Sequence, residues 1–185
     1  MLTHEMTIAG LKRHLPICRV TDDLYIGAFV IFGDCELTTA CAEELLKKAP
    51  EYDYIITAES KGIPLAQEMA RLAKDEKWLL ARKGPKLYMQ DILCVEVKSI
   101  TTEKVQKLYL DGNDAKLMKG KKILVVDDVI STGESLRALE ELVLTAGGEI
   151  AGRMTILAEG EAQDRKDIVY LEKLPLFNAK GEIIG

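Results

Sequence analysis

Residues 123–135 read Ile-Leu-Val-Val-Asp-Asp-Val-Ile-Ser-Thr-Gly-Glu-Ser, and this stretch decides the fold. It opens on an uninterrupted apolar run, which predicts a central parallel strand over 121–128 that is buried on both faces. Two carboxylates, Asp127 and Asp128, end the strand, and a turn of small residues follows them. In open α/β sheets, ligands bind at the carboxyl ends of strands, so the sequence predicts a binding site here.

The turn after the acidic pair has the groups that bind a phosphate. Ser131, Thr132 and Ser135 supply hydroxyls, and Gly133 permits close approach or a positive φ. A helix is predicted over 135–146, and its N-terminus directs N–H groups and partial positive charge at the same place. This assembly suits a phosphate monoester, while the two carboxylates upstream suit the vicinal hydroxyls of a ribose. A diphosphate on the same sugar would bring Mg²⁺.

Short apolar runs alternate with helix-period segments on both sides of this stretch, which predicts a single α/β domain. Its fold class is a Rossmann-like central parallel sheet with flanking helices. Helices are predicted at 35–48 and 63–74, and strands at 54–57, 78–81, 92–97, 107–110, 150–157 and 168–171.

Composition excludes several classes of protein. The chain has 185 residues with 48% apolar and 30% charged, which is ordinary for a globular domain. Its net charge of −5 has the wrong sign for a nucleic-acid binder. No apolar run is long enough to span a membrane, and no signal peptide is recognisable. The four cysteines lack metal-ligand spacing and are expected to be buried thiols in a reducing compartment, so we expect a cytoplasmic protein with neither nucleic-acid nor membrane partners.

All thirteen positions of 123–135 fit the motif with which type I phosphoribosyltransferases bind phosphoribosyl pyrophosphate. The motif is four apolar residues, two acidic, two apolar, one small, Thr-Gly, any residue, then Thr or Ser. The sequence therefore resembles this family. The resemblance implies that Asp127 and Asp128 hold the ribose hydroxyls and Mg²⁺, directly or through substrate and water. It also implies a cradle for the 5-phosphate, built mainly from the backbone amides of Ser131, Thr132, Gly133, Glu134 and Ser135.

A second segment is similar to the adenine branch of the family. Residues 58–62, Ala-Glu-Ser-Lys-Gly, resemble its E-S-R-G pyrophosphate loop, with Lys61 where arginine is usual. The resemblance implies that Ser60, Lys61 and Gly62 bind the pyrophosphate, and that a non-proline cis peptide lies in this loop.

A third segment, Ala-Arg-Lys-Gly-Pro-Lys-Leu at 81–87, is similar to R-K-P-G-K-L of the adenine branch, with Gly and Pro exchanged. The resemblance implies that Arg82 and Lys86 neutralise the pyrophosphate as it leaves. The alternative is a charged turn that only faces solvent.

Ser99 and Glu103 fall where the adenine branch has a mobile hood that carries S-x-x-x-E. The resemblance therefore implies that Glu103, Asp128 and Arg82 are catalytic residues. For Glu103, an ordinary surface carboxylate is an equal alternative. The implied reaction is a displacement at the anomeric carbon through an oxocarbenium-like transition state, with Mg²⁺ and cationic side chains stabilising the departing charge. The resemblance also implies a homodimer.

Base recognition is expected from residues 1–34, an N-terminal segment or hood subdomain that precedes a core domain at 35–185. This segment lacks the Leu-Phe-Arg-Asp-Ile motif of adenine enzymes. Tyr25, Phe29 and Phe32 could stack on a base or pack in the core. Adenine is the expected substrate in purine salvage, and xanthine or hypoxanthine and guanine are the alternatives.

Two other kinds of protein share parts of this pattern. A regulator on the same fold would sense phosphoribosyl pyrophosphate without catalysis. Such proteins carry an extra nucleic-acid-binding domain, and only about 50 residues precede the first predicted core strand, fewer than a separate domain usually has. A receiver-type signalling domain needs four more βα units, and only 57 residues follow Asp128.

Overall fold

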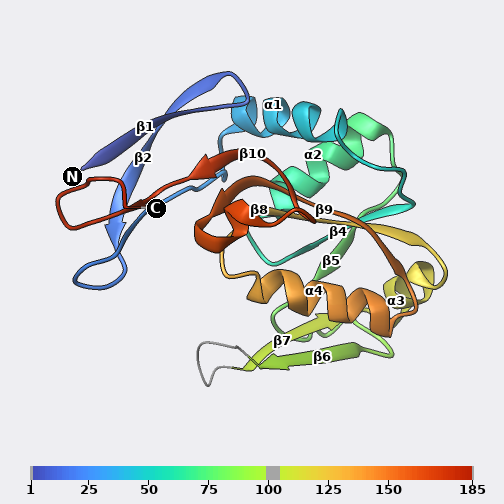
Figure 1. Cartoon of the computed structure of the whole chain (residues 1–185). Helices are drawn as coiled ribbons and strands as arrows, with labels where there is room; N and C mark the ends of the chain where they lie inside the picture. Colours follow the sequence, from blue (N-terminus) through green and yellow to red (C-terminus); the bar gives the residue numbers. More distant parts are fainter. Residues whose placement is uncertain (1, 99–104, 185) are drawn as a thin grey trace.

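The computed structural model describes residues 2–98 and 105–184. Its centre is a parallel five-stranded sheet in the order β10-β9-β8-β4-β5 (Figure 1). The strands are β4 (Tyr54–Ala58), β5 (Leu79–Ala81), β8 (Lys122–Ile130), β9 (Glu149–Glu159) and β10 (Val169–Leu174). The predicted α/β class and parallel sheet are confirmed.

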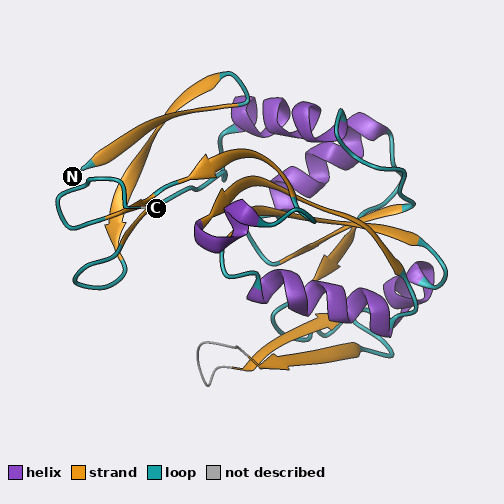
Figure 2. Ribbon diagram, in the orientation of Figure 1, coloured by secondary structure: helices purple, strands orange, loops and turns teal. Residues whose placement is uncertain are grey.

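Helices cover both faces of this sheet (Figure 2). One face carries α1 (Cys35–Leu46) and α2 (Ile63–Ala73), and the other carries α4 (Glu134–Thr145) and the short α3 (Gly112–Met118). A hairpin of β6 (Leu93–Lys98) and β7 (Val105–Leu110) packs against α4. The sequence predicted α1, α2 and α4 within two residues at each end but not α3.

The central strand β8 is buried on both faces, as its apolar sequence predicted. Ile123, Leu124, Val125 and Val126 are at most 1% exposed. Ile123 and Val125 pack on the α4 side, whereas Leu124 and Val126 pack on the side of α1 and α2. Each such side chain contributes about 1.5–3 kcal/mol by burial, so β8 is a rigid support for the residues at its carboxyl end.

A second, antiparallel sheet lies beside the core in the order β1-β2-β3-β11 (Figure 1). It contains β1 (Thr3–Ile8), β2 (Leu11–Arg19), β3 (Tyr25–Gly27) and β11 (Leu176–Phe177). The C-terminal strand β11 pairs with β3, so this sheet combines both ends of the described chain. The sequence predicted none of these strands, and the boundary between residues 34 and 35 stays a prediction.

The four cysteines of the chain are free thiols, but the expectation that they are buried holds only for Cys41, since Cys18 is half-buried and Cys35 and Cys94 are exposed. Among residues 2–98 and 105–184, no helix is both long enough and apolar enough to cross a bilayer.

Helices α1 and α2 are tied together by the carboxylate of Glu68. It accepts hydrogen bonds from Arg71 Nε at 2.8 Å and Nη2 at 2.9 Å, and from Thr39 Oγ1 on α1 at 2.7 Å. The Arg71 bonds and then the Thr39 bond lower the pKa of Glu68 from 4.5 to about 2. A carboxyl whose pKa is lowered by folding stabilises the protein above its unfolded pKa, and this stabilisation is lost as the pH falls toward the folded value.

We therefore expect Glu68→Gln to lower the free energy of unfolding at pH 6, and we expect this deficit to shrink as the pH falls from about 4.5 toward 2. Urea unfolding of both proteins at pH 6, 4 and 3 measures it. A deficit that is the same at all three pH values would contradict the assignment of this stabilisation to the Glu68 carboxylate.

Candidate functional site

The site lies where the strand order of the sheet changes direction. From β4 the chain passes through α2 to β5 on one side, and from β8 it passes through α4 to β9 on the other side. Loops that leave neighbouring parallel strands in opposite directions open a crevice at the carboxyl ends of those strands. The loop at 59–62 follows β4, and residues 127–135 end β8 and lead into α4. Two of the predicted motifs therefore meet at one place.

The acidic pair is held next to the predicted pyrophosphate loop. Asp128 is 3% exposed, and its Oδ2 lies 2.8 Å from Lys61 Nζ. The backbone N–H of Asp128 donates to Asp127 Oδ1 at 2.9 Å. Burial, and then the charge of Asp128, raise the pKa of the Asp127 carboxyl well above its ordinary value. The crevice thus holds two neighbouring acidic side chains, one of which forms an ion pair with Lys61.

Lys61 also connects the crevice to the N-terminal segment, because its Nζ donates to the carbonyl of Phe29 at 3.4 Å. The Phe29 ring is buried in the core, whereas Phe32 is 49% exposed and Tyr25 lies half-buried in β3. Of the three aromatic residues considered for base stacking, Phe29 is a core residue.

The loop after β4 has the backbone that the resemblance implied. The peptide bond between Glu59 and Ser60 is cis, and Gly62 begins α2. A Cβ at Gly62 would lie 2.2 Å from Thr57 Oγ1, 3.0 Å from Asp127 Oδ1 and 3.3 Å from Asp127 Cα. Glycine is therefore required here by space, and its close approach brings the loop against the acidic pair.

The turn at 131–135, which the sequence analysis predicted as a phosphate cradle, lies at the N-terminus of α4. Gly133 has a φ of +76° and starts α4, so the first N–H groups of this helix open onto the turn. A cavity of about 120 Å³ lies there. Ser135 Oγ is held by Gln106 Nε2 at 3.1 Å, while Thr132 is exposed. The cavity is lined by Asp127, Val129, Ile130, Ser131, Thr132, Gly133, Glu134, Ser135 and Leu136.

Arg82 is held by a neighbour that the sequence analysis did not single out. Its guanidinium donates to Glu59 Oε1 and, at 2.8 Å, to the hydroxyl of Tyr88. Although burial opposes it, the hydrogen bonds from Arg82 and from the backbone of Lys83 lower the pKa of Glu59. This pair places Arg82 beside the cis peptide. Lys86 is exposed at the surface of its loop.

Ser99 and Glu103 lie outside the described residues, so the predicted hood stays a prediction.

A further carboxylate borders the crevice from β9. Glu159 is the last residue of that strand and is buried. Burial raises its pKa, against a hydrogen bond from Ser131 and the charge of Lys61. The sequence analysis missed Glu159, although its place at the carboxyl end of the strand beside β8 was a usable signal.

The donor set suits a magnesium ion that is shared with a substrate. Within the described residues, no group of three or more His, Cys, Asp or Glu side chains could enclose a metal ion. Asp128 Oδ2 pairs with Lys61 and has no other polar partner in that part of the chain. Mg²⁺ is usually held by one or two carboxylates together with substrate phosphates and water. Asp127 and Asp128 fit that role, directly or through water.

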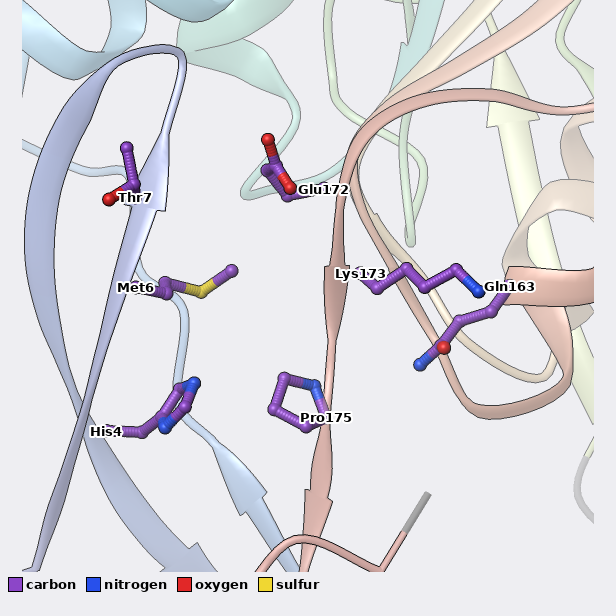
Figure 3. A pocket seen from close by; sticks show the side chains of 7 residues that line it. All are labelled: His4, Met6, Thr7, Gln163, Glu172, Lys173 and Pro175. Atoms are coloured by element: carbon purple, nitrogen blue, oxygen red, sulfur yellow. The ribbon is translucent and has the colours of Figure 1, made fainter.

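A cavity of about 530 Å³ lies away from this crevice, between β1 and β10 (Figure 3). Among the described residues, its lining includes none of the predicted site residues. It is lined by His4, Met6, Thr7, Gln163, Glu172, Lys173 and Pro175.

The chain as a whole is similar to proteins of known family. The family model described as "Phosphoribosyl transferase domain" matches residues 36–180. A hypoxanthine/guanine phosphoribosyltransferase from Methanothermococcus okinawensis is 31% identical over 140 residues, which is 72% of each chain. A xanthine phosphoribosyltransferase from Exiguobacterium sp. is 35% identical over 106 residues, which is 57% of this chain and about half, 53%, of that relative.

Among solved structures, an adenine phosphoribosyltransferase from Thermoanaerobacter pseudethanolicus superposes with a TM-score of 0.64 at 22% identity. The superposition covers 77% of this chain and 84% of that one, and it confirms the predicted fold. Together with the family match, these similarities show that the chain belongs to the phosphoribosyl transferase family and is a phosphoribosyltransferase of the purine type.

Proposed function

We propose that this protein transfers the 5-phosphoribosyl group from phosphoribosyl pyrophosphate to a purine base, giving the nucleoside monophosphate and pyrophosphate. The observation that carries the proposal is the contact between Lys61 and Asp128 at 2.8 Å. It joins the loop predicted to bind the pyrophosphate to the acidic pair predicted to bind the ribose, at the opening of the phosphate cradle. Adenine is the base proposed first, with hypoxanthine, guanine and xanthine as alternatives.

The proposed roles follow the order of groups along the substrate. The N–H groups and hydroxyls of 131–135 bind the 5-phosphate at the N-terminus of α4. Asp127 and Asp128 accept hydrogen bonds from the ribose hydroxyls. Ser60, Lys61 and Gly62 bind the pyrophosphate. The positive charge of Lys61 offsets the negative charge of this leaving group. Mg²⁺, when bound through Asp127 and Asp128, would neutralise part of the same charge.

In the reaction, the bond from the anomeric carbon to the pyrophosphate oxygen breaks, and its electron pair leaves with pyrophosphate. A ring nitrogen of the base forms the new bond to that carbon as its N–H bond breaks, and the proton passes to the departing pyrophosphate or to water. Arg82 and Lys86 are proposed to stabilise the departing charge. The ion pair with Glu59 keeps Arg82 close to the pyrophosphate loop before substrate arrives. Glu103, on the predicted hood, is proposed to act near the base or the leaving group.

The base is proposed to bind on the side of the N-terminal segment. This is supported by the hydrogen bond from Lys61 to the Phe29 carbonyl, which brings that segment to the crevice. We also propose a homodimer in the cytoplasm without nucleic-acid or membrane partners. The four free thiols and the net charge of −5 support that location and the absence of nucleic acid.

The test is release of pyrophosphate from Mg²⁺–phosphoribosyl pyrophosphate, measured in parallel with adenine, guanine, hypoxanthine, xanthine, uracil and orotate. We expect release that depends on a purine and a matching nucleoside monophosphate by chromatography. Release that depends on uracil or orotate would overturn the purine assignment. No release with any base, together with thermal stabilisation by phosphoribosyl pyrophosphate, would favour the non-catalytic regulator.

A further inference from the structure

We propose that Arg165 binds the 5-phosphate of the ligand and completes the cradle from a third segment of the chain. This inference rests on the proposed function, since it assumes that the cradle at 131–135 receives a phosphate monoester. Arg165 lies outside the motifs that carry the resemblance. It directly follows the short 3-10 helix η1 (Gly160–Asp164), which connects β9 to β10.

The position of Arg165 is given by its approach to Gly133. A Cβ at Gly133 would lie 2.9 Å from Arg165 Nη1. Gly133 is buried and has a left-handed backbone at the first turn of α4. The guanidinium therefore lies against the cradle at the residue where the helix N-terminus opens. A side chain at 133 would displace the guanidinium from this position.

The orientation of the guanidinium is set by Asp167. Arg165 Nε donates to Asp167 Oδ1 at 3.0 Å, and Nη2 donates to Asp167 Oδ2 at 2.7 Å. These two bonds occupy one edge of the planar group, and Nη1, on its other side, is the atom that lies against Gly133. The side chain is 32% exposed, so a ligand can reach it. A guanidinium fixed along one edge loses little freedom when the other binds a phosphate.

The charge of the cradle gives a reason for a cation at this point. Among the residues that the structure describes, its lining includes the acidic side chain of Asp127 but no lysine or arginine. The N-terminus of α4 supplies only about half a positive charge. A phosphate monoester carries close to two negative charges near neutral pH. The guanidinium of Arg165, held by Asp167 along one edge, brings a cation next to Gly133, and arginine is suited to phosphate oxygens.

The experiment measures binding of ribose 5-phosphate and, separately, of Mg²⁺–pyrophosphate by calorimetry to the wild-type protein and Arg165→Gln. A hydrogen bond to a charged group corresponds to about 10- to 100-fold in affinity. We expect Arg165→Gln to weaken ribose 5-phosphate by that factor and to leave pyrophosphate binding and the melting temperature nearly unchanged. Arg165→Lys should recover part of the loss, because it restores charge without the planar geometry.

A matched control exists on α2. Arg71 forms the same two-bond pair with Glu68, at the end of α2 opposite Gly62, so Arg71→Gln makes the same chemical change away from the crevice. It should leave ribose 5-phosphate binding unchanged. Asp167→Asn should weaken ribose 5-phosphate less than Arg165→Gln does, since it loosens the guanidinium without removing it.

The inference is overturned if Arg165→Gln binds ribose 5-phosphate as tightly as the wild type, or if the wild type does not bind it. An equal loss for both ligands with a lower melting temperature would also overturn it, by showing a structural role. Its failure is distinguishable from failure of the proposed function. Binding that depends on Arg165 without base-dependent release of pyrophosphate would reject the transferase reaction and leave the phosphate contact in place.

Discussion

Asp128→Asn is expected to lower kcat/KM for phosphoribosyl pyrophosphate by about 100-fold or more, a loss comparable to removing one preorganised charge or donor from an active site. The substitution keeps the shape of the side chain but removes the charge that holds Lys61 at 2.8 Å. It also removes one carboxylate from the proposed ribose and magnesium site. Steady-state kinetics with the base identified by the release assay measures the effect.

The control for this variant is Asp53→Asn. Asp53 directly precedes β4, and its carboxylate pairs with Lys121 at 3.1 Å. The same change of charge at the opposite end of the sheet should leave kcat/KM near the wild-type value. An unchanged kcat/KM in folded Asp128→Asn would reject its role toward the ribose.

Gly62→Ala is expected to damage both stability and activity. The added methyl group would lie 2.2 Å from Thr57 Oγ1 and 3.3 Å from Asp127 Cα, so the loop or β8 must move. Overpacking of this kind costs about 1–3 kcal/mol of unfolding free energy. A displacement of about 1 Å in a reacting geometry costs about 100-fold in rate. Thermal unfolding and pyrophosphate release measure the two losses.

Two further variants test the cause of this damage. Gly84→Ala adds a methyl group that meets no atom within 4 Å, so its melting temperature should match the wild type. Thr57→Ala removes the nearest obstacle, and combining it with Gly62→Ala should return part of the lost stability. Additive losses in the double variant would contradict the steric account.

The central part of the fold was predictable because its local and long-range requirements agree. The run Ile-Leu-Val-Val at 123–126 is apolar on both faces, and only a central strand of a parallel sheet buries both. The helix after it begins at Glu134, one residue from its predicted start, because Gly133 permits the backbone turn. The cis peptide at Glu59–Ser60 and the contact of its loop with the acidic pair agree with the resemblance.

The N-terminal sheet was not predictable in the same way. The turn between β1 and β2 uses Ala9 and Gly10, both with positive φ. The usual sequence signal of such two-residue hairpins is Asn or Asp before Gly, and this chain has alanine in that place. The pairing of β3 with β11 joins segments about 150 residues apart, which no local pattern reports.

Contacts between individual charged side chains also could not be predicted from the order of residues along the chain. Glu59 precedes the pyrophosphate loop, yet its partner Arg82 comes from the loop after β5. Arg165 reaches Gly133 from the connection between β9 and β10. In both cases the sheet brings loops together that the chain keeps apart, so only the three-dimensional structure shows the pairing.

The pairing of β11 with β3 has a consequence for synthesis of the chain. Until Leu176 and Phe177 have been made, the edge of β3 that they cover offers unpaired N–H and C=O groups. An open strand edge is a template for another chain, so the nascent protein is exposed to aggregation at β3 until residues 176–177 have emerged. By pairing with β3, strand β11 thus protects the side of the protein proposed to recognise the base.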